Sequence, residues 1–134
     1  MSLIVDASII VKWFVGEQGS SEARSLFEAG DEFIAPSLVI AEVGNALRKK
    51  VRGSAISAEQ AQTALQSLPK FLTRYVDLNE LVDRALEISL HLSHPIYDCF
   101  YLVLAERENV AVVSADARMI AAGKRLGTID IRKL

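Results

Sequence analysis

The opening stretch Met1-Ser-Leu-Ile-Val-Asp-Ala-Ser8 is the key to the fold class. Leu3-Ile-Val5 is a short apolar run, partly β-branched, of the kind that forms a strand buried on both faces. Asp6 follows at the carboxyl end of this strand, and residues 9–15 are mostly apolar and predict a helix. Open α/β sheets keep their sites outside the carboxyl ends of the strands, so Asp6 is placed where a functional carboxylate is expected.

Helical patterns and short apolar runs alternate along the remaining chain. They predict helices within residues 20–29, 37–51, 57–68, 79–92, 97–105 and 116–125, and strands over 33–35, 73–76, 110–113 and 128–131. Ser57 and Gln60 match a capping box, and Asn79 is the expected cap of the helix over 79–92. The alternation predicts one α/β domain, residues 1–134, with a mostly parallel sheet and helices on both faces.

Composition limits the compartment and the partners. The chain has 134 residues, of which 51% are hydrophobic, enough for a substantial core. A net charge of −2 gives no general attraction to nucleic acid, so a polyanion needs local bases or metal ions. The single cysteine, Cys99, cannot form an internal disulfide, which favours a reducing cytoplasm. We expect no targeting segment and no membrane span, because no apolar run is long enough.

Four acids stand in unusual places. Asp6 ends a buried strand, Glu42 interrupts an apolar helical stretch, Asp98 heads a nearly all-apolar helix, and Asp116 follows the clearest strand. Burying a lone carboxylate is costly, and these four have few basic neighbours in the sequence, with Arg118 the nearest. A divalent cation relieves the repulsion among clustered carboxylates, and Mg²⁺ and Mn²⁺ prefer oxygen ligands.

Each acid also has a simpler interpretation. Three of them could cap the helices that follow, whereas Glu42 lies within a helix and has no such role. Glu42, Asn45, Lys49 and Arg52 recur at steps of three and four and line one stripe. The stripe suggests a ligand, a positioning amide and phosphate contacts, although a solvated face explains the two bases equally well.

The same segments, taken together, resemble the PIN-domain pattern and are most similar to the VapC toxins of VapBC toxin–antitoxin pairs. The resemblance covers essentially the whole chain in the right order. It rests on Ile4-Val-Asp-Ala-Ser8, Val11-Lys-Trp-Phe14, Ala41-Glu-Val-Gly-Asn45, Tyr97-Asp98 with Tyr101-Leu102 and Ala105, and Val113-Ser-Ala-Asp116. It implies a three-layer α/β/α sandwich, Mg²⁺- or Mn²⁺-dependent RNA cleavage, homodimerisation and inhibition by a VapB-type antitoxin.

The resemblance also implies roles for individual residues. Asp6, Asp98 and Asp116 would hold one or two divalent ions, with Glu42 as ligand or general base, so that a bound water attacks the phosphodiester. Ser8 and Ser114 would support the ligands, although Ser8 equally well caps the first helix, and Asn45 would orient Glu42 or a phosphate. Candidate RNA contacts are Lys12, Arg48, Lys49, Arg52 and Arg118.

Other residues have simpler explanations. His91 and His94 lack partners for a zinc site and most simply end a helix. Cys99 is expected to be a buried small hydrophobe, and Trp13, Phe14, Phe100 and Tyr101 are expected core or dimer contacts. Two other functions stay open: a housekeeping PIN nuclease in RNA maturation, and, more weakly, a Mg²⁺-binding phosphoryl-transfer or signalling domain. The last lacks a second Asp at position 8 and a Lys soon after Val113.

Overall fold

A computed structural model describes residues 1–134 and contains one five-stranded sheet. The strands are β1 (Ser2–Val5), β2 (Glu32–Pro36), β3 (Leu72–Val76), β4 (Val112–Ser114) and β5 (Ile131–Lys133). They lie in the order β3-β2-β1-β4-β5, and every neighbouring pair is parallel. The expected mostly parallel sheet is therefore confirmed, and it contains no antiparallel pair.

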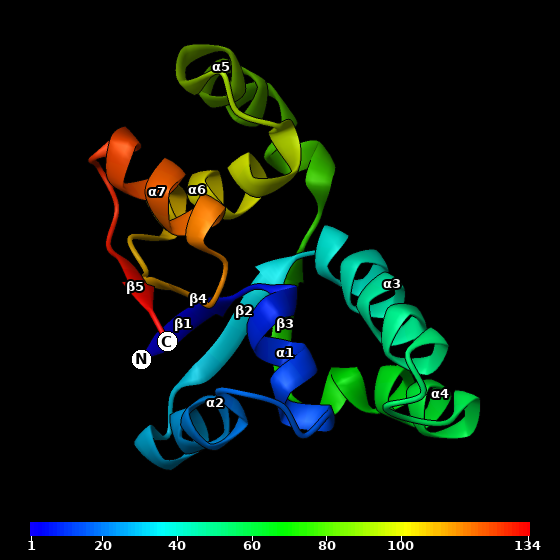
Figure 1. Ribbon diagram of the computed structural model, residues 1–134. Helices are drawn as coiled ribbons and strands as arrows, with labels where there is room; N and C mark the ends of the chain where they lie inside the picture. The colour runs from blue at the N-terminus through cyan, green and yellow to red at the C-terminus, as the bar shows by residue number, and fades with distance from the viewer.

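Helices cover both faces of this sheet, which confirms the three-layer α/β/α sandwich (Figure 1). The chain moves from β1 to β3 in one direction and then returns to β4 and β5 on the other side of β1. Because crossovers between parallel strands are right-handed, this reversal places α1 to α4 on one face and α5 to α7 on the other. The helices are α1 (Ala7–Phe14), α2 (Ser20–Ser25), α3 (Leu38–Arg52), α4 (Ala58–Ser67), α5 (Val82–Leu92), α6 (Ile96–Glu108) and α7 (Ala117–Leu126).

Helix α6 is the central buried helix, as its apolar sequence predicted. Residues 99–105 are all buried, and the helix packs against β1, β2 and β4. Cys99 is part of this core, as expected. None of the chain's helices combines the length and the apolar content that a membrane crossing requires.

Several element boundaries differ from the sequence prediction. The last strand begins at Ile131 rather than at residue 128, although it is an edge strand as expected. Asn79 does not cap α5. Instead Asp77 accepts the Asn79 N–H at 2.8 Å and caps a short 3₁₀ turn (Leu78–Glu80), after which α5 starts at Val82. The predicted helix over 20–29 divides into α2 and a 3₁₀ turn (Leu26–Ala29) that ends at Gly30.

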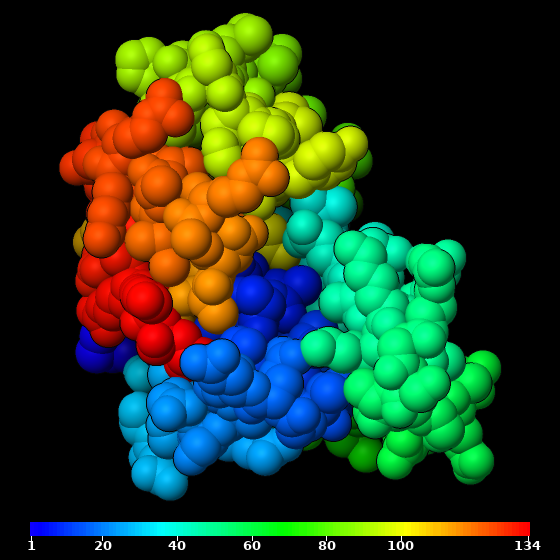
Figure 2. Space-filling model, viewed as in Figure 1, coloured from blue at the N-terminus to red at the C-terminus, as the bar shows by residue number.

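The reversal of strand order fixes where a site can form. β1 pairs with β2 on one side and with β4 on the other, so the connections after β1 and β4 leave on opposite faces of the sheet. Such a switch point opens a crevice at the carboxyl ends of the two strands. Figure 2 shows a hollow of the molecular surface between the residues of α7 and those of α3, with N-terminal residues in its floor.

Candidate active site

Asp6 lies at the switch point, directly after β1, and is only 5% exposed. Its Oδ1 accepts hydrogen bonds from Ser8 Oγ at 2.5 Å and from the Ile9 N–H at 3.3 Å, and its Oδ2 accepts from Ser114 Oγ at 2.5 Å. Burial raises the pKa of Asp6 above its usual value, since the three donors only partly offset the loss of water. Asp6 is therefore both the N-cap of α1 and a buried carboxylate.

The two serines tie the ends of β1 and β4 together. Ser8 Oγ accepts the Ala115 N–H at 2.9 Å, and Ser114 Oγ accepts the Asp116 N–H at 3.0 Å, while both hydroxyls donate to Asp6. The structure thus brings Ser8 and Ser114 together beside Asp6, which agrees with the supporting role toward a carboxylate that the family resemblance implied for them. The alternative in which Ser8 caps the first helix is wrong, because Asp6 occupies the capping position.

Glu42 lies on α3, and a buried phenol holds its carboxylate. Tyr101 on α6 is fully buried, and its Oη donates to Glu42 Oε1 at 2.6 Å. Burial raises the pKa of Glu42, and the negative charges of the other three acids raise it further against the opposing effect of the Tyr101 hydrogen bond. Burial and the Glu42 charge also raise the pKa of Tyr101 well above its usual value.

Asn45 does not orient Glu42 in this structure, and the alternative in which it orients a phosphate stays a prediction. Asn45 is exposed on α3 and forms no side-chain hydrogen bond, whereas Tyr101 fills the orienting role. Sequence reasoning assigned Tyr101 only a core or dimer role because it stands in an uninterrupted apolar run. Its spacing of three residues from Asp98, which places both on one face of α6, was the available signal.

Asp116 and Asp98 occupy different positions at the start of their helices. Asp116 is the N-cap of α7, and its Oδ1 accepts the Arg118 N–H at 2.9 Å. Asp98 lies in the first turn of α6, whose N-cap is Pro95, so the capping interpretation is correct for Asp6 and Asp116 but wrong for Asp98. His94 instead holds Asp98 through a 2.7 Å contact between Nε2 and Oδ2, which the prediction that His94 merely ends a helix missed.

The four acids lie near enough to one another for their charges to interact. Asp6, Asp98 and Asp116 all raise the pKa of Glu42, and Asp116 raises that of Asp6. No Lys or Arg forms an ion pair with any of the four. No three acidic, histidine or cysteine side chains are grouped closely enough to hold one ion by direct contact alone. The arrangement is a group of interacting acids that no lysine or arginine neutralises.

The candidate RNA contacts divide into two groups. Arg48, Lys49, Arg52 and Arg118 are exposed and form no ion pair within the chain. Lys12 is committed elsewhere, because its Nζ contacts Glu17 Oε1 at 3.3 Å and donates to the Gln18 carbonyl at 2.8 Å. Lys50 also pairs with Glu17, which links the end of α1 to α3. Of the five candidates, Lys12 is therefore the one whose side chain is paired within the chain.

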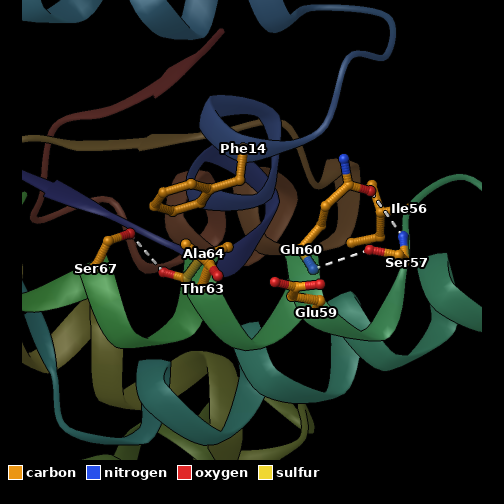
Figure 3. Close-up of a pocket in the computed structure, with 8 residues that line it drawn as sticks. All are labelled: Phe14, Ile56, Ser57, Glu59, Gln60, Thr63, Ala64 and Ser67. Carbon is orange, nitrogen blue, oxygen red and sulfur yellow. Dashed lines mark hydrogen bonds between the residues drawn. The ribbon is translucent and has the colours of Figure 1, made fainter.

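A separate hollow of about 380 Å³ lies between the end of α1 and α4 (Figure 3). Phe14 faces α4 across it, and Ser57 and Gln60 form the predicted capping box at one end. None of the four acids lines this hollow. It is therefore a feature of the α1–α4 contact rather than part of the acidic site.

Comparison with known proteins places the chain in a family. The PIN domain model matches residues 3–125. Ribonuclease VapC1 of Mycobacterium tuberculosis is 36% identical over 123 residues, which cover 89% of each chain. The M. tuberculosis toxin VapC20, which cleaves the sarcin–ricin loop, has a similar fold, with a TM-score of 0.74, 15% identity and coverage of 91% of this chain and 95% of that chain.

A second solved structure extends the likeness over nearly the full length. It contains VapBC2 from Rickettsia felis bound to a DNA fragment of the promoter, and the matched chain has a TM-score of 0.71 at 17% identity, covering 99% of this chain and 98% of that chain. At this identity the likeness concerns the fold. The family is shown by the PIN domain model and by the relative of 36% identity. This chain belongs to the PIN domain family and groups with its VapC-type members.

Proposed function

We propose that this chain is a Mg²⁺- or Mn²⁺-dependent endoribonuclease that acts as the toxin of a toxin–antitoxin pair. The nuclease assignment is supported by the relatives of VapC type, which are named ribonucleases. The single observation that carries the metal dependence is the convergence of Asp6, Glu42, Asp98 and Asp116, none of which pairs with a lysine or arginine. Four such charges close enough to interact favour a cation.

The donor set fits a hard divalent ion. Glu42 Oε2, Asp98 Oδ1 and Asp116 Oδ2 have no hydrogen-bond donor from the chain. No buried side-chain nitrogen or oxygen lacks a partner, so these three oxygens are open to solvent. Mg²⁺ commonly keeps several waters and uses one or two protein carboxylates, which suits acids that are near one another without touching. Asp6, Asp98 and Asp116 would hold the ion partly through its bound waters, with Glu42 beside them.

The chain's own residues supply the remaining parts of the reaction. A bound ion would polarise the phosphodiester and acidify a water molecule. Glu42 is suited to accept the proton of the attacking water, because Tyr101 holds its Oε1 and leaves Oε2 without a donor from the chain. Tyr101 keeps that carboxylate in place, and Ser8 and Ser114 do the same for Asp6. The exposed cations that would contact phosphates of the RNA are Arg48, Lys49, Arg52 and Arg118.

The test of the metal-dependent nuclease is a cleavage assay on RNA with Mn²⁺ or Mg²⁺ and with EDTA. We expect cleavage by the wild type only with the ion, and a loss of activity for Asp6→Asn of at least roughly a hundredfold. Asp83→Asn is the matched control, because Asp83 is an exposed residue of α5 that forms no ion pair. Equal cleavage by wild type and Asp6→Asn, or cleavage that survives EDTA, would overturn the mechanism.

The toxin assignment needs a test of its own. Expression without an antitoxin should arrest growth, and Asp98→Asn should relieve the arrest. The VapBC complex among the structures of similar fold supports a VapB-type antitoxin as partner. An active enzyme that leaves growth unchanged would favour a housekeeping PIN nuclease. The phosphoryl-transfer or signalling alternative has no support, because the family match is to a PIN domain.

A further inference from the structure

Asp98 differs from the other three acids in what holds it. Asp6 and Asp116 accept backbone N–H groups as helix N-caps, and Glu42 accepts the Tyr101 hydroxyl. Asp98 accepts no backbone N–H, and its one partner in the chain is His94 Nε2 at 2.7 Å. Because an ionised carboxylate has no hydrogen to donate, the imidazole is the donor in this pair.

The turn before α6 fixes the position of the His94 backbone. The His94 N–H donates to the Ser89 carbonyl at 3.1 Å, and Ser89 Oγ donates to the His94 carbonyl at 2.6 Å. Ser93 adopts a left-handed φ of 50° that ends α5, and Pro95 restricts the residue before it. Hydrogen bonds therefore fix both the N–H and the carbonyl of His94. The His94 side chain is only 11% exposed.

Without His94 the Asp98 carboxylate would have no fixed orientation. Its side chain is 21% exposed, and its position in the first turn of α6 gives it no capping bond to the backbone. The contact uses Oδ2 and leaves Oδ1 free. A donor that binds one oxygen of a metal-ligating carboxylate sets the direction of the other, and removal of such a partner commonly weakens metal binding about 10–100-fold.

We propose that His94 is a positioning residue for the divalent-ion site, which orients Asp98 by donating from Nε2 to Oδ2 so that Oδ1 serves as the ligand. This inference rests on the proposed metal-dependent function. It assigns His94 a role that differs from ending a helix or forming a surface ion pair. A surface ion pair would contribute to folding and leave ion binding unchanged.

The experiment measures Mn²⁺ binding to the intact chain without RNA, by the EPR signal of free Mn²⁺ and by calorimetry. We expect His94→Leu to weaken binding roughly tenfold or more. His94→Gln should stay within about threefold of the wild type, because its amide Nε2 can donate from nearly the same position. His94→Asn keeps an amide on a shorter side chain that cannot reach Asp98, so it should behave like His94→Leu and serves as the second variant if the leucine variant does not fold.

A double-mutant cycle separates an effect through Asp98 from a general effect. In an Asp98→Asn background, His94→Leu should cause no further decrease in Mn²⁺ affinity. Melting curves in EDTA show that each variant is folded before its affinity is compared. If the wild type binds no Mn²⁺, the proposed function fails. If the wild type binds Mn²⁺ and His94→Asn or His94→Leu binds equally well, or His94→Gln is as weak as they are, the role of His94 is wrong.

Discussion

At the level of single residues, the site consists of four carboxylates and the donors that hold them. Hydroxyls hold Asp6, a phenol holds Glu42 and an imidazole holds Asp98. The donors are neutral or weakly charged groups, so each orients its acid without cancelling the negative charge that attracts a cation. A lysine or arginine in the same place would compete with the ion.

Tyr101→Phe tests the orientation of Glu42. The hydroxyl stabilises the charged form of Glu42, so its removal should raise the pKa of Glu42 and move the acidic limb of the cleavage profile to higher pH. At neutral pH we expect a decrease smaller than the roughly 100-fold that removal of a general base causes. The measurement is kcat/KM against pH with Mn²⁺. Tyr97→Phe, at an exposed tyrosine of the same helix, should leave the profile unchanged.

Glu42→Gln should stabilise the fold when no divalent ion is present. The pKa of Glu42 is raised in the folded state, so its contribution to stability is complete below the unfolded-state pKa and disappears as the pH rises through the folded-state pKa. At neutral pH the glutamine keeps an acceptor for Tyr101 without the buried charge. We expect a melting temperature about 2–4 °C higher in EDTA, the shift that ~1 kcal/mol produces in a domain of this size, and no gain at acid pH. A lower melting temperature at neutral pH would contradict this.

The basic residues should separate by salt dependence. Lys49→Ala and Arg118→Ala each remove an exposed, unpaired cation, so the slope of log K for RNA against log salt should become shallower by nearly one for each phosphate that the variant no longer neutralises. Lys12→Ala removes the interactions with Glu17 and with the Gln18 carbonyl, and it should lower the melting temperature while leaving the slope unchanged. Equal slopes for all three variants would contradict the division into RNA-binding cations and a lysine that is paired within the chain.

At the level of secondary-structure elements, two helical glycines differ in what surrounds them. Gly44 lies on α3, where an added Cβ would have Leu65 Cδ2 as its nearest neighbour at 3.7 Å. Gly123 lies on α7, where an added Cβ would meet Ile131 Cδ1 at 2.8 Å and Cγ2 at 2.9 Å. The close approach shows that Gly123 lets α7 pack tightly against the edge strand β5.

Alanine substitutions should therefore have opposite effects at these positions. Gly44→Ala should stabilise the chain by about 0.5–1 kcal/mol through helix propensity. Gly123→Ala gains the same propensity but crowds Ile131, and we expect a net destabilisation of about 1–2 kcal/mol. Urea unfolding monitored by circular dichroism measures both. A stabilising Gly123→Ala would mean that β5 shifts at little cost.

At the level of the whole molecule, α5 presents an uncovered apolar stripe. Val82, Leu86 and Leu90 recur at steps of four and are 38%, 51% and 72% exposed. Contiguous exposed apolar residues are typical of protein interfaces. This stripe is the surface of the fold that would suit the homodimer expected from the family resemblance.

The dimer prediction is tested by mass in solution. We expect a dimer for the wild type by light scattering after size exclusion, and a monomer when Leu86→Glu and Leu90→Glu are combined, because two charges cannot be buried unpaired in an interface. Asp83→Asn, on the same helix, is the control that should remain dimeric. A double variant that stays dimeric would place the interface elsewhere, and a monomeric wild type would contradict the dimer itself.

The parallel sheet, the central helix and the acids Asp6 and Glu42 were predictable from sequence alone. Hydrophobic periodicity and the position of a residue at a strand end are local properties, so they can be read without knowing how the chain packs. Two roles stayed open for Ser8 from the sequence, and the structure shows the one in which it supports Asp6. Element boundaries were less accurate, as at β5, because helix and strand ends depend on caps and neighbouring strands.

The groups that hold the acids became known only from the packing of the chain. Tyr101 reaches Glu42 across 59 residues of sequence and Ser114 reaches Asp6 across 108, and these pairings follow from strand order and helix facing, which no local pattern encodes. The pairing of Lys12 with Glu17 and with the Gln18 carbonyl is a further result of packing. The contact of His94 with Asp98 is short in sequence, but it forms because a tight turn places the imidazole beside the first turn of α6. Local sequence therefore placed the acids, and packing supplied the donors that orient them.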